Sequence, residues 1–366
     1  MSWKRSTAHD RNLSDVTALL QLRLLLPDAQ LNELLPTSPP AELARRFCLH
    51  RMNDTIERRT ASALRELQRL QVRIVTVADT EYPEPLARLE QHKPPMLFYR
   101  GDYALLDTRT VAIVGTRRST EYGNSVAEML AGDFARYGVT VISGLALGVD
   151  THAHRGALQM AGATIAVLGC GIDVFYPQRN ARLQERIASE GLLLSEFAPG
   201  APAMPHHFRQ RNRLIALLAS GVIVVEAKHK SGTRNTVEWA GNYGVTVFAV
   251  PGPIGREASA GTNALIQDGA SLVTCVRDVL EELHWPVQPV MTTSSDHAPG
   301  RTPAAGAAAA IYRTLGAVGM QIDEIARAAS CATADALVVL AELELDGLVQ
   351  QLPGKRFARA RVLDES

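Results

Sequence analysis

Residues 110–123 read TVAIVGTRRSTEYG, a short β-branched and apolar run followed by a glycine-containing basic loop that leads into a helix-periodic stretch. Continuous apolar runs that alternate with helices are typical of a parallel sheet covered on both faces. The pattern recurs along the chain, with apolar runs at 111–114, 139–142, 164–168, 192–194, 222–225, 245–250 and 271–273. The sequence therefore predicts an α/β fold whose ligand site lies in the loops at the carboxyl ends of the strands.

Length and composition limit the class of protein. The chain has 366 residues, 46% of them hydrophobic and 21% charged, which predicts a soluble globular protein of more than one domain. No apolar run is long enough to span a membrane, and the N-terminal residues lack the pattern of a secretion signal. The four cysteines are far apart, which argues against a disulfide framework or a structural zinc site and favours a reducing cytoplasm.

Four segments are expected along the chain. Residues 1–80 predict a small helical module, because Val16, Leu19, Leu22 and Leu26 recur at helical spacing. Residues 81–285 form the α/β core, and residues 286–308, rich in Pro, Ser, Thr and Ala, read as a linker. Residues 309–366 predict three helices and a basic hairpin, a pattern that fits a winged helix. Contact with DNA and contact with protein both remain open for this last segment.

Several of the predicted loops favour the binding of an anion. Gly115, Arg117 and Arg118 follow the strand at 111–114, where glycine amides, a helix N-terminus and a guanidinium suit a phosphate. The segment 228–236 has hydroxyl and basic residues in the same position on another strand. An ordinary basic surface loop explains that segment equally well.

The segment 207–213 has a different composition. It reads HFRQRNR, so that Phe208 stands among alternating arginines. Arginines neutralise phosphates and an aromatic ring stacks unpaired bases, which is what single-stranded nucleic acid requires. A buried Phe208 flanked by surface arginines is the equally weighted alternative.

Two other residue groups suggest chemistry but favour a structural role. Asp150, His152 and His154 lie at spacings that point to different sides of a helix, so Asp150 is expected to cap the helix rather than bind a metal. Cys170 lies between two glycines, and a small buried residue is the preferred interpretation. The sequence also contains no Walker loop, no G-x-S-x-G motif and no histidine pair at helical spacing, so no catalytic set is expected.

Taken together, the loops resemble the DNA processing protein A family, known as DprA or Smf. The matching motifs run in order: Tyr82-Pro83, 94–99 with Gly101, 114–117 with Tyr122-Gly123, 143–150 with His154 and 156–158, Gly169-Cys170-Gly171 with Tyr176-Pro177, Ser195-Glu196, Phe208 with Arg211-Asn212-Arg213, Ser231-Gly232 with Thr236, Pro251-Gly252, 261–263, Leu265-Ile266 and Gly269-Ala270. Each motif is weak alone, but about ten in register over some 200 residues, roughly 80–285, are specific.

The resemblance implies an extended Rossmann-like, mostly parallel sheet with a SAM-like or helix-hairpin-helix-like N-terminal module and a C-terminal winged helix. It implies a cofactor-free, non-enzymatic protein that binds and protects single-stranded DNA in natural transformation and loads the recombinase RecA onto it. A homodimer and displacement of single-strand binding protein are expected as well. The residues expected at the DNA are Gly115, Arg117, Arg118, Ser143, Gly144, Gly171, Phe208, Arg211, Asn212, Arg213, Lys230, Ser231, Gly232 and Thr236.

Two alternatives come from other functional classes. Thr236 followed closely by Glu238 resembles the P-G-G-x-G-T-x-x-E loop of phosphoribohydrolases of the lysine-decarboxylase-like group, although the spacing is one residue too short. A transcription regulator is the other alternative, in which the winged helix reads duplex DNA and the core senses a nucleotide. Preference for single strands, for mononucleotides or for one duplex sequence would separate the three functions.

Overall fold

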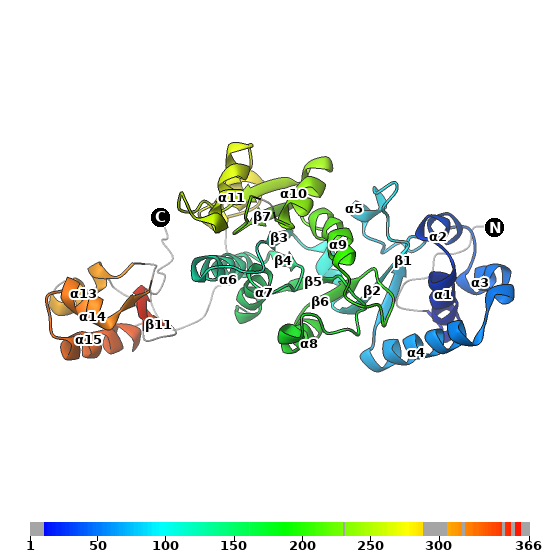
Figure 1. Ribbon diagram of the computed structural model, residues 1–366, viewed down its shortest axis with the longest axis horizontal. Coiled ribbons are helices and arrows are strands. Elements are labelled where there is room, and N and C mark those ends of the chain that lie inside the picture. The colour runs from blue at the N-terminus through cyan, green and yellow to red at the C-terminus, as the bar shows by residue number, and fades with distance from the viewer. Residues whose placement is uncertain are drawn as a thin grey trace. The chain divides into compact units, whose positions relative to one another are not determined.

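The computed structural model describes residues 11–160, 162–229, 231–287, 306–316, 319–345, 348–352 and 356–359. The chain divides into two compact units, Met1–Met291 and Thr292–Ser366 (Figure 1). Among the described helices, none has both the length and the apolar character needed to cross a membrane.

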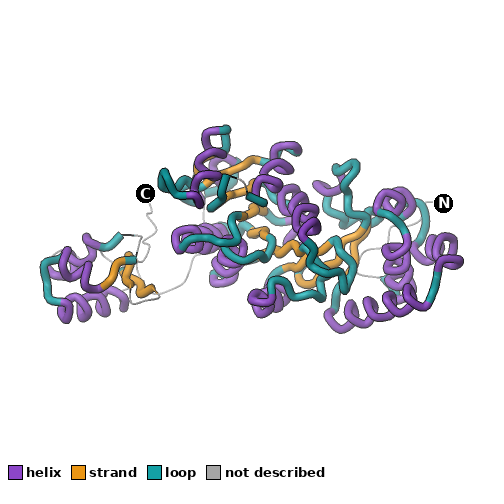
Figure 2. Tube along the Cα trace, in the orientation of Figure 1, coloured by secondary structure: helices purple, strands orange, loops and turns teal. Residues whose placement is uncertain are grey.

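A sheet forms the centre of the first unit, with its strands in orange in Figure 2. It has nine strands in the order β1-β2-β6-β5-β4-β3-β7-β8-β9. The strands from β6 to β9 in this order are parallel, whereas β2 pairs antiparallel with both β6 and β1. The bounds are β1 (Arg73–Thr76), β2 (Met96–Gly101), β3 (Thr110–Val114), β4 (Thr140–Ser143), β5 (Thr164–Leu168), β6 (Leu192–Ser195), β7 (Gly221–Val224), β8 (Thr246–Ala249) and β9 (Ser271–Leu272). All seven parallel strands lie at or near predicted apolar runs, so the prediction of a mostly parallel α/β sheet is confirmed.

Helices cover both faces of this sheet, and the alternation of side chains shows which helix covers which face. Ala112 and Ile142 pack with α9 (Pro205–Leu217) and α10 (Thr233–Asn242) on one face. Val111 and Val141 pack with the helices of the other face, α6 (Glu121–Arg136), α7 (Val149–Gln159) and α12 (Val276–Glu282). The remaining helices of the core are α5 (Glu84–Ala87), α8 (Ala181–Glu190) and α11 (Glu257–Gln267). Both faces of the sheet are therefore buried, which is why the strands are continuous apolar runs.

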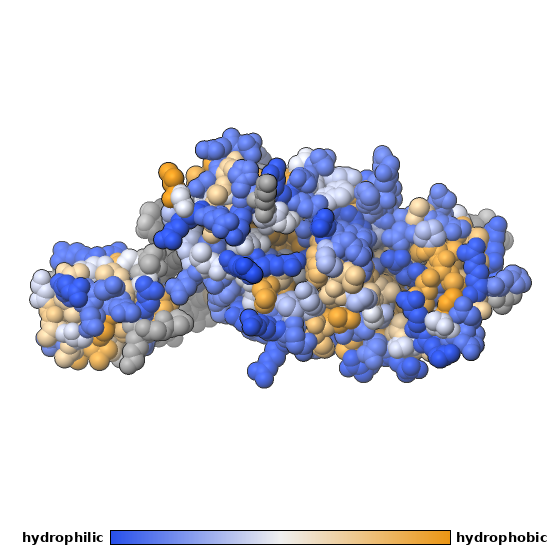
Figure 3. Space-filling view, viewed as in Figure 1, coloured by the Kyte–Doolittle hydropathy of each residue, from blue (hydrophilic) through white to orange (hydrophobic). Residues whose placement is uncertain are grey.

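The N-terminal helices lie on the same face of the sheet as α6, α7 and α12. They are α1 (Leu13–Leu25), α2 (Asp28–Leu34), α3 (Pro40–Cys48) and α4 (Asp54–Leu70). Their buried leucines share one apolar cluster with Phe98, Leu168 and Leu193 of the sheet. The Asn32 side chain donates to the Lys93 carbonyl oxygen at 2.9 Å, and Arg11 forms a buried ion pair with Asp79. In Figure 3 an apolar area lies over α1 and α2, with hydrophilic residues around it.

The expected boundary at residue 80 needs a correction. The residues of β1 were assigned to a helical module, but they form a strand that pairs with β2 in the central sheet. The chain turns into this strand at Gln71, which adopts a left-handed φ of 55° at the end of α4. The α/β core therefore starts at residue 73.

The second unit has its own small core. Three helices, α13 (Gly306–Thr314), α14 (Ile322–Ala328) and α15 (Thr333–Leu345), pack around Ile311, Ile325 and Leu340. The strands β10 (Met320–Gln321), β11 (Val349–Leu352) and β12 (Arg356–Arg359) form an antiparallel sheet in the order β10-β12-β11. The predicted winged-helix pattern is present, whereas most of the predicted linker lies outside the described residues.

Candidate nucleic-acid interface

A surface hollow lies at the carboxyl ends of β3, β4 and β5, where the prediction placed the ligand site. Three loops and the first turn of α9 supply its walls. The residues that line it are Arg117, Gly144, Leu145, Ala146, Leu147, Tyr176, Pro177 and Phe208. Arg117 and Phe208, predicted from separate segments, thus meet at one place.

Phe208 lies at the centre of this group. Its ring packs so closely on Gly169 that a Cβ atom added to Gly169 would lie 2.5 Å from Cδ1 of the ring. The Arg117 guanidinium carbon lies 5.0 Å from the ring centroid, and the Tyr176 ring lies 5.3 Å away at an interplanar angle of 32°. Phe208 is half-buried, whereas Arg117 and Tyr176 are exposed. The hollow therefore presents a cation and aromatic carbon together, as stacked nucleic-acid sites do.

Glu226 holds the loop that carries Arg117. The Glu226 carboxylate, which is buried, accepts hydrogen bonds from the Thr120 backbone N–H at 2.9 Å and from the Thr120 hydroxyl at 2.5 Å. The Glu226 carbonyl oxygen accepts from the Thr116 N–H at 2.8 Å. Gly115 leaves room for this contact, because an added Cβ would lie 2.9 Å from the same carbonyl oxygen. Arg117 and Arg118 are thus displayed from a loop fixed at both ends.

The β4–α7 loop uses its amides internally. The Asp150 carboxylate accepts hydrogen bonds from the N–H groups of Gly144 and Ala146 at 3.2 and 3.3 Å. Burial raises the pKa of Asp150, and the positive charge of Arg211 opposes that rise. The expected helix cap is corrected here, because the N-cap of α7 is Gly148, and Asp150 organises the loop before it. Ser143 is buried and its hydroxyl donates to the Ile113 carbonyl oxygen at 2.7 Å.

Arg211 is buried against the β4–α7 loop. It is 3% exposed and donates to the Val167 carbonyl oxygen. A Cβ atom added to Gly144 would lie 2.3 Å from Nη1 of Arg211, so the glycine gives the guanidinium its space. Burial lowers the pKa of Arg211 to about 10, which leaves it charged at neutral pH.

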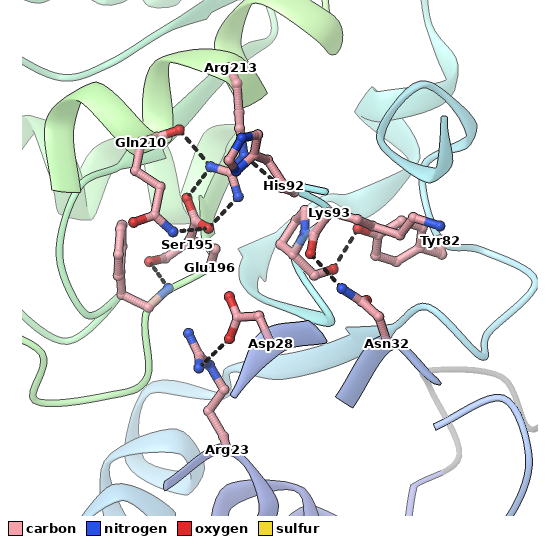
Figure 4. A network of polar contacts seen from close by, with 12 residues as sticks. Arg23, Asp28, Asn32, Tyr82, His92, Lys93, Ser195, Glu196, Gln210 and Arg213 are labelled. Atoms are coloured by element: carbon pink, nitrogen blue, oxygen red, sulfur yellow. Dashed lines mark hydrogen bonds and ion pairs between the residues drawn. The ribbon is translucent and has the colours of Figure 1, made fainter. Parts of the chain in front are cut away.

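Arg213 is buried on the other side of α9. Its guanidinium pairs with Glu196 at 2.6 Å, with both side chains at most 3% exposed. It also donates to the His92 carbonyl oxygen at 2.8 Å, while Gln210 donates to Glu196 at 2.9 Å (Figure 4). This network ties α9 to the segment before β2. Arg211 and Arg213, both expected at the DNA, thus lie buried in the structure rather than at the surface.

The loop after β5 also makes hydrogen bonds within the protein. Gly171 is buried, and its N–H donates to the Ala201 carbonyl oxygen at 2.9 Å. Burial raises the pKa of Cys170 to about 11, so its thiol stays protonated at neutral pH, and the interpretation as a buried residue is confirmed. The Gly171 N–H, expected at a phosphate, is thus engaged with a carbonyl oxygen of the protein.

The α10 loop follows β7. Ser231 is half-buried, and its hydroxyl has no hydrogen-bond partner among the described residues. Gly232 is exposed at the N-cap of α10, and Thr236 is buried one turn later. Asn212 is half-buried on α9, and Lys230 lies outside the described residues.

The acidic and histidine residues near the second loop have separate partners. His152 contacts Glu128 at 2.9 Å, and Nδ1 of His154 contacts the Thr164 hydroxyl at 2.8 Å. Within the described ranges, no group of three or more His, Cys, Asp or Glu side chains is arranged to hold a metal. The contacts with Glu128 and Thr164 fit the structural role expected for the two histidines.

Helix α15 of the second unit carries no basic residue that could contact DNA. In winged helices, the helix in the position of α15 commonly enters the major groove. Here its exposed residues include Asp335, Glu342 and Glu344 together with Leu337 and Val338, and its sequence contains no Lys or Arg. Arg359, expected in a basic hairpin, instead donates to the Tyr312 carbonyl oxygen at 2.9 Å. The described residues thus favour a protein contact over a DNA contact for α15.

Three residues of this region, Tyr176, Glu196 and Glu226, have no site role predicted from the sequence. Tyr176 and Glu196 lie within short motifs, and Glu226 lies just before the basic segment 228–236. Each follows a strand end, at the edge of the sheet where the loops converge. That position was the signal that could have identified them.

Comparison with known proteins supports a single family. Residues 73–284 match the DNA recombination-mediator protein A family, and residues 295–355 match the DprA winged helix domain. The DNA processing protein DprA of Streptococcus pneumoniae is 46% identical over 211 residues, which cover 57% of this chain and 74% of the relative. A putative DprA of Mycobacterium tuberculosis is 36% identical over 365 residues, covering 91% of this chain and 92% of the relative.

Solved structures agree. The X-ray structure of S. pneumoniae DprA matches with a TM-score of 0.59 and 37% identity, covering 75% of this chain and 94% of that one. A structure of Helicobacter pylori DNA processing protein A, described for its single-stranded DNA binding mode, matches with a TM-score of 0.53 and 34% identity over 58% of this chain and 95% of that one. The chain therefore belongs to the DNA recombination-mediator protein A family, also called DprA or Smf.

Proposed function

We propose that this protein binds single-stranded DNA in the hollow between Arg117, Tyr176 and Phe208. The observation that carries the proposal is the contact of Arg117 with Phe208 at 5.0 Å, beside an exposed tyrosine, at the carboxyl ends of parallel strands. A guanidinium neutralises a phosphate, and an aromatic ring stacks any base, so binding is expected to be independent of sequence. The H. pylori relative, described for single-stranded DNA binding, supports the same ligand class.

The hydroxyl residues at the start of α10 extend the proposed site. Ser231 and Gly232 lie where backbone N–H groups of a helix N-terminus attract an anion. We assign a second phosphate to this loop, with Lys230 as an expected contributor. Arg211, Arg213, Ser143 and Gly171 then act by positioning the loops that hold the strand.

The finer part of the proposal concerns partners. We propose that the bound strand is protected and passed to RecA in natural transformation, that single-strand binding protein is displaced, and that the protein acts as a homodimer without a cofactor. The acidic and apolar surface of α15 suits a protein contact of this kind. No catalytic role is proposed, because Thr236 is buried while Glu238 is exposed, so the two side chains do not face a common substrate.

Fluorescence anisotropy tests the ligand class. Labelled single strands of several sequences and a duplex of equal length are titrated with the full chain between about 50 and 200 mM salt. The proposal expects similar affinity for all single strands and weaker binding of the duplex. Preference for one duplex sequence would instead favour a transcription regulator, and binding or cleavage of mononucleotides alone would favour a hydrolase.

A RecA assay tests the finer part. RecA filament formation is followed on strands already covered by single-strand binding protein, with and without this protein. Faster filament formation is expected. Unchanged kinetics in the presence of tight strand binding would remove RecA loading while leaving the DNA-binding proposal intact.

A further inference from the structure

Helix α4 has two faces of opposite character. Ala63 and Leu67 are buried on its inner face, in the apolar cluster of the N-terminal helices. Arg58, Arg65 and Arg69 recur at intervals of seven and four residues, which place them in one line on the opposite face, and all three are exposed. These three residues form an arginine stripe that is about 16 Å long, at 1.5 Å per residue.

The protein neutralises the charge of the arginine stripe only weakly. Arg58 lies 3.8 Å from Asp54 and Arg69 lies 2.7 Å from Glu66, and both pairs are formed within α4 and are open to solvent. In the part of the chain that the structure describes, no acidic side chain forms an ion pair with Arg65. Because exposed ion pairs contribute little stability, a bound anion can compete for these guanidinium groups.

The end of α3 adds further positive charge next to the start of α4. Arg45, Arg46 and Arg51 are exposed there, and residues 45–53 contain no Asp or Glu. Residues 45–69 contain seven arginines and three acidic residues, within a chain whose net charge is zero. A local cluster of exposed guanidinium groups is the electrostatic pattern that suits a phosphate backbone.

The C-terminal end of α4 points toward α8 (Figure 1). The pKa of Arg69 is raised, first by its hydrogen bond to Glu66 and then by the charges of Glu185, on α8, and of Asp173. Asp173 lies three residues before Tyr176, which lines the hollow. A strand that leaves the hollow over Tyr176 would therefore reach the arginine stripe at its Arg69 end.

The two carboxylates between the hollow and α4 already have partners. Glu185 pairs with Arg100 at 3.0 Å, and Asp173 accepts a hydrogen bond from the Gly200 N–H at 2.8 Å. These contacts reduce the repulsion that the two carboxylates would exert on a passing phosphate.

We infer that the arginine stripe of α4 is a second contact for single-stranded DNA and binds the phosphates of the part of the strand that lies beyond the hollow. The inference rests on the proposed function, because the strand first occupies the hollow. Since α4 contains no aromatic residue, the contact is with phosphates and does not depend on the bases. The N-terminal helices thereby lengthen the segment of DNA that one chain binds.

Strand length separates the two contacts. One probe is an oligothymidylate of about 6 nucleotides, near the lower end of known single-strand site sizes, and the other has about 30 nucleotides, beyond their upper end. The short probe can fill the hollow, whereas only the long probe can also reach α4. The full chain is titrated with each probe by fluorescence anisotropy between about 50 and 200 mM salt.

The test variant carries Arg58→Gln, Arg65→Gln and Arg69→Gln together. Glutamine is a good helix former, so α4 should stay folded, and thermal melting checks this. Affinity for the long probe should fall about 10- to 100-fold at low salt. Its salt slope should fall by up to about 2, because each phosphate contact on a single strand contributes about 0.7. Binding of the short probe should stay at the wild-type level.

The matched control carries Arg88→Gln, Arg277→Gln and Arg327→Gln together. It loses the same number of positive charges from exposed positions outside α4. The control should bind both probes as the wild type does. An equal loss of affinity for the long probe in the control would assign the effect to net charge and would overturn the inference.

The outcomes separate this inference from the proposed function. If the wild-type protein binds neither probe, the proposed function fails and the inference fails with it. If the wild type binds both probes and the α4 variant binds the long probe with wild-type affinity and salt slope, the inference fails alone. The long probe annealed to its complement supplies the remaining outcome. An α4 variant that loses binding of this duplex but keeps binding of the long single strand would show that α4 contacts duplex DNA, against the inference.

Discussion

Replacing Arg213 by methionine should destabilise the first unit without changing its contact with DNA. The substitution removes the cationic partner of Glu196, whose side chain is 1% exposed, and leaves this carboxylate with Gln210 as its remaining side-chain donor. It also removes the donors to the His92 and Gln210 carbonyl oxygens. Breaking a buried ion pair by removing one partner typically costs about 3–5 kcal/mol. We expect the free energy of unfolding to fall by that amount.

Urea denaturation followed by circular dichroism measures the change. The double variant Arg213→Met with Glu196→Leu should recover much of the loss, because no unpaired charge then remains buried. Arg88→Met is the control, since its pair with Glu84 is solvent-exposed, and the unfolding midpoint should stay unchanged. A stable Arg213→Met variant that has lost single-strand affinity would refute the structural role and return Arg213 to the DNA interface.

Three further predictions concern His154, Gly169 and Gly241. Burial lowers the pKa of His154 from 6.5 to about 3, so the histidine stays neutral in the folded protein. The free energy of unfolding should therefore fall as the pH drops below 6.5, the pKa of the unfolded chain, and the loss should reach about 3 kcal/mol at pH 4. In His154→Asn, the urea midpoint should depend less on pH. Gly169→Ala should displace Phe208 and weaken single-strand binding several-fold, roughly 1 kcal/mol, in the anisotropy titration, because the added Cβ would lie 2.5 Å from the ring. Gly241→Ala should raise the free energy of unfolding by about 0.5–1 kcal/mol, because alanine is a better helix former than glycine in α10. An added Cβ at this position meets nothing within 4 Å. An unchanged urea midpoint would contradict this prediction.

The parallel part of the sheet was predictable because of its burial. Every residue of β3 and β5 is buried, so each strand is an uninterrupted apolar run. The strands β1 and β2 were missed for a different reason. The apolar part of β1 is only two residues long, and β2 follows two prolines in a segment recognised only as a motif. Their antiparallel pairing depends on contacts distant in sequence, which periodicity does not reveal.

The candidate site was predicted in outline. Arg117 and Phe208 were both expected and lie together, since strand ends converge at one edge of the sheet. The burial of Arg211 and Arg213 could not be foreseen from a basic run. It depends on the space left at Gly144 and on the carboxylate of Glu196, both of which come from other loops.

Single-strand binding by Arg117→Ala is the most direct test of the central claim. Affinity for a single strand is measured at several salt concentrations for wild type, Arg117→Ala and the control Arg182→Ala, an exposed arginine on α8. Loss of one charge-assisted contact should cost roughly 1–3 kcal/mol and lower the salt slope by about 0.7, while the control stays close to wild type. An Arg117→Ala variant with wild-type affinity and slope would contradict the placement of the strand in this hollow.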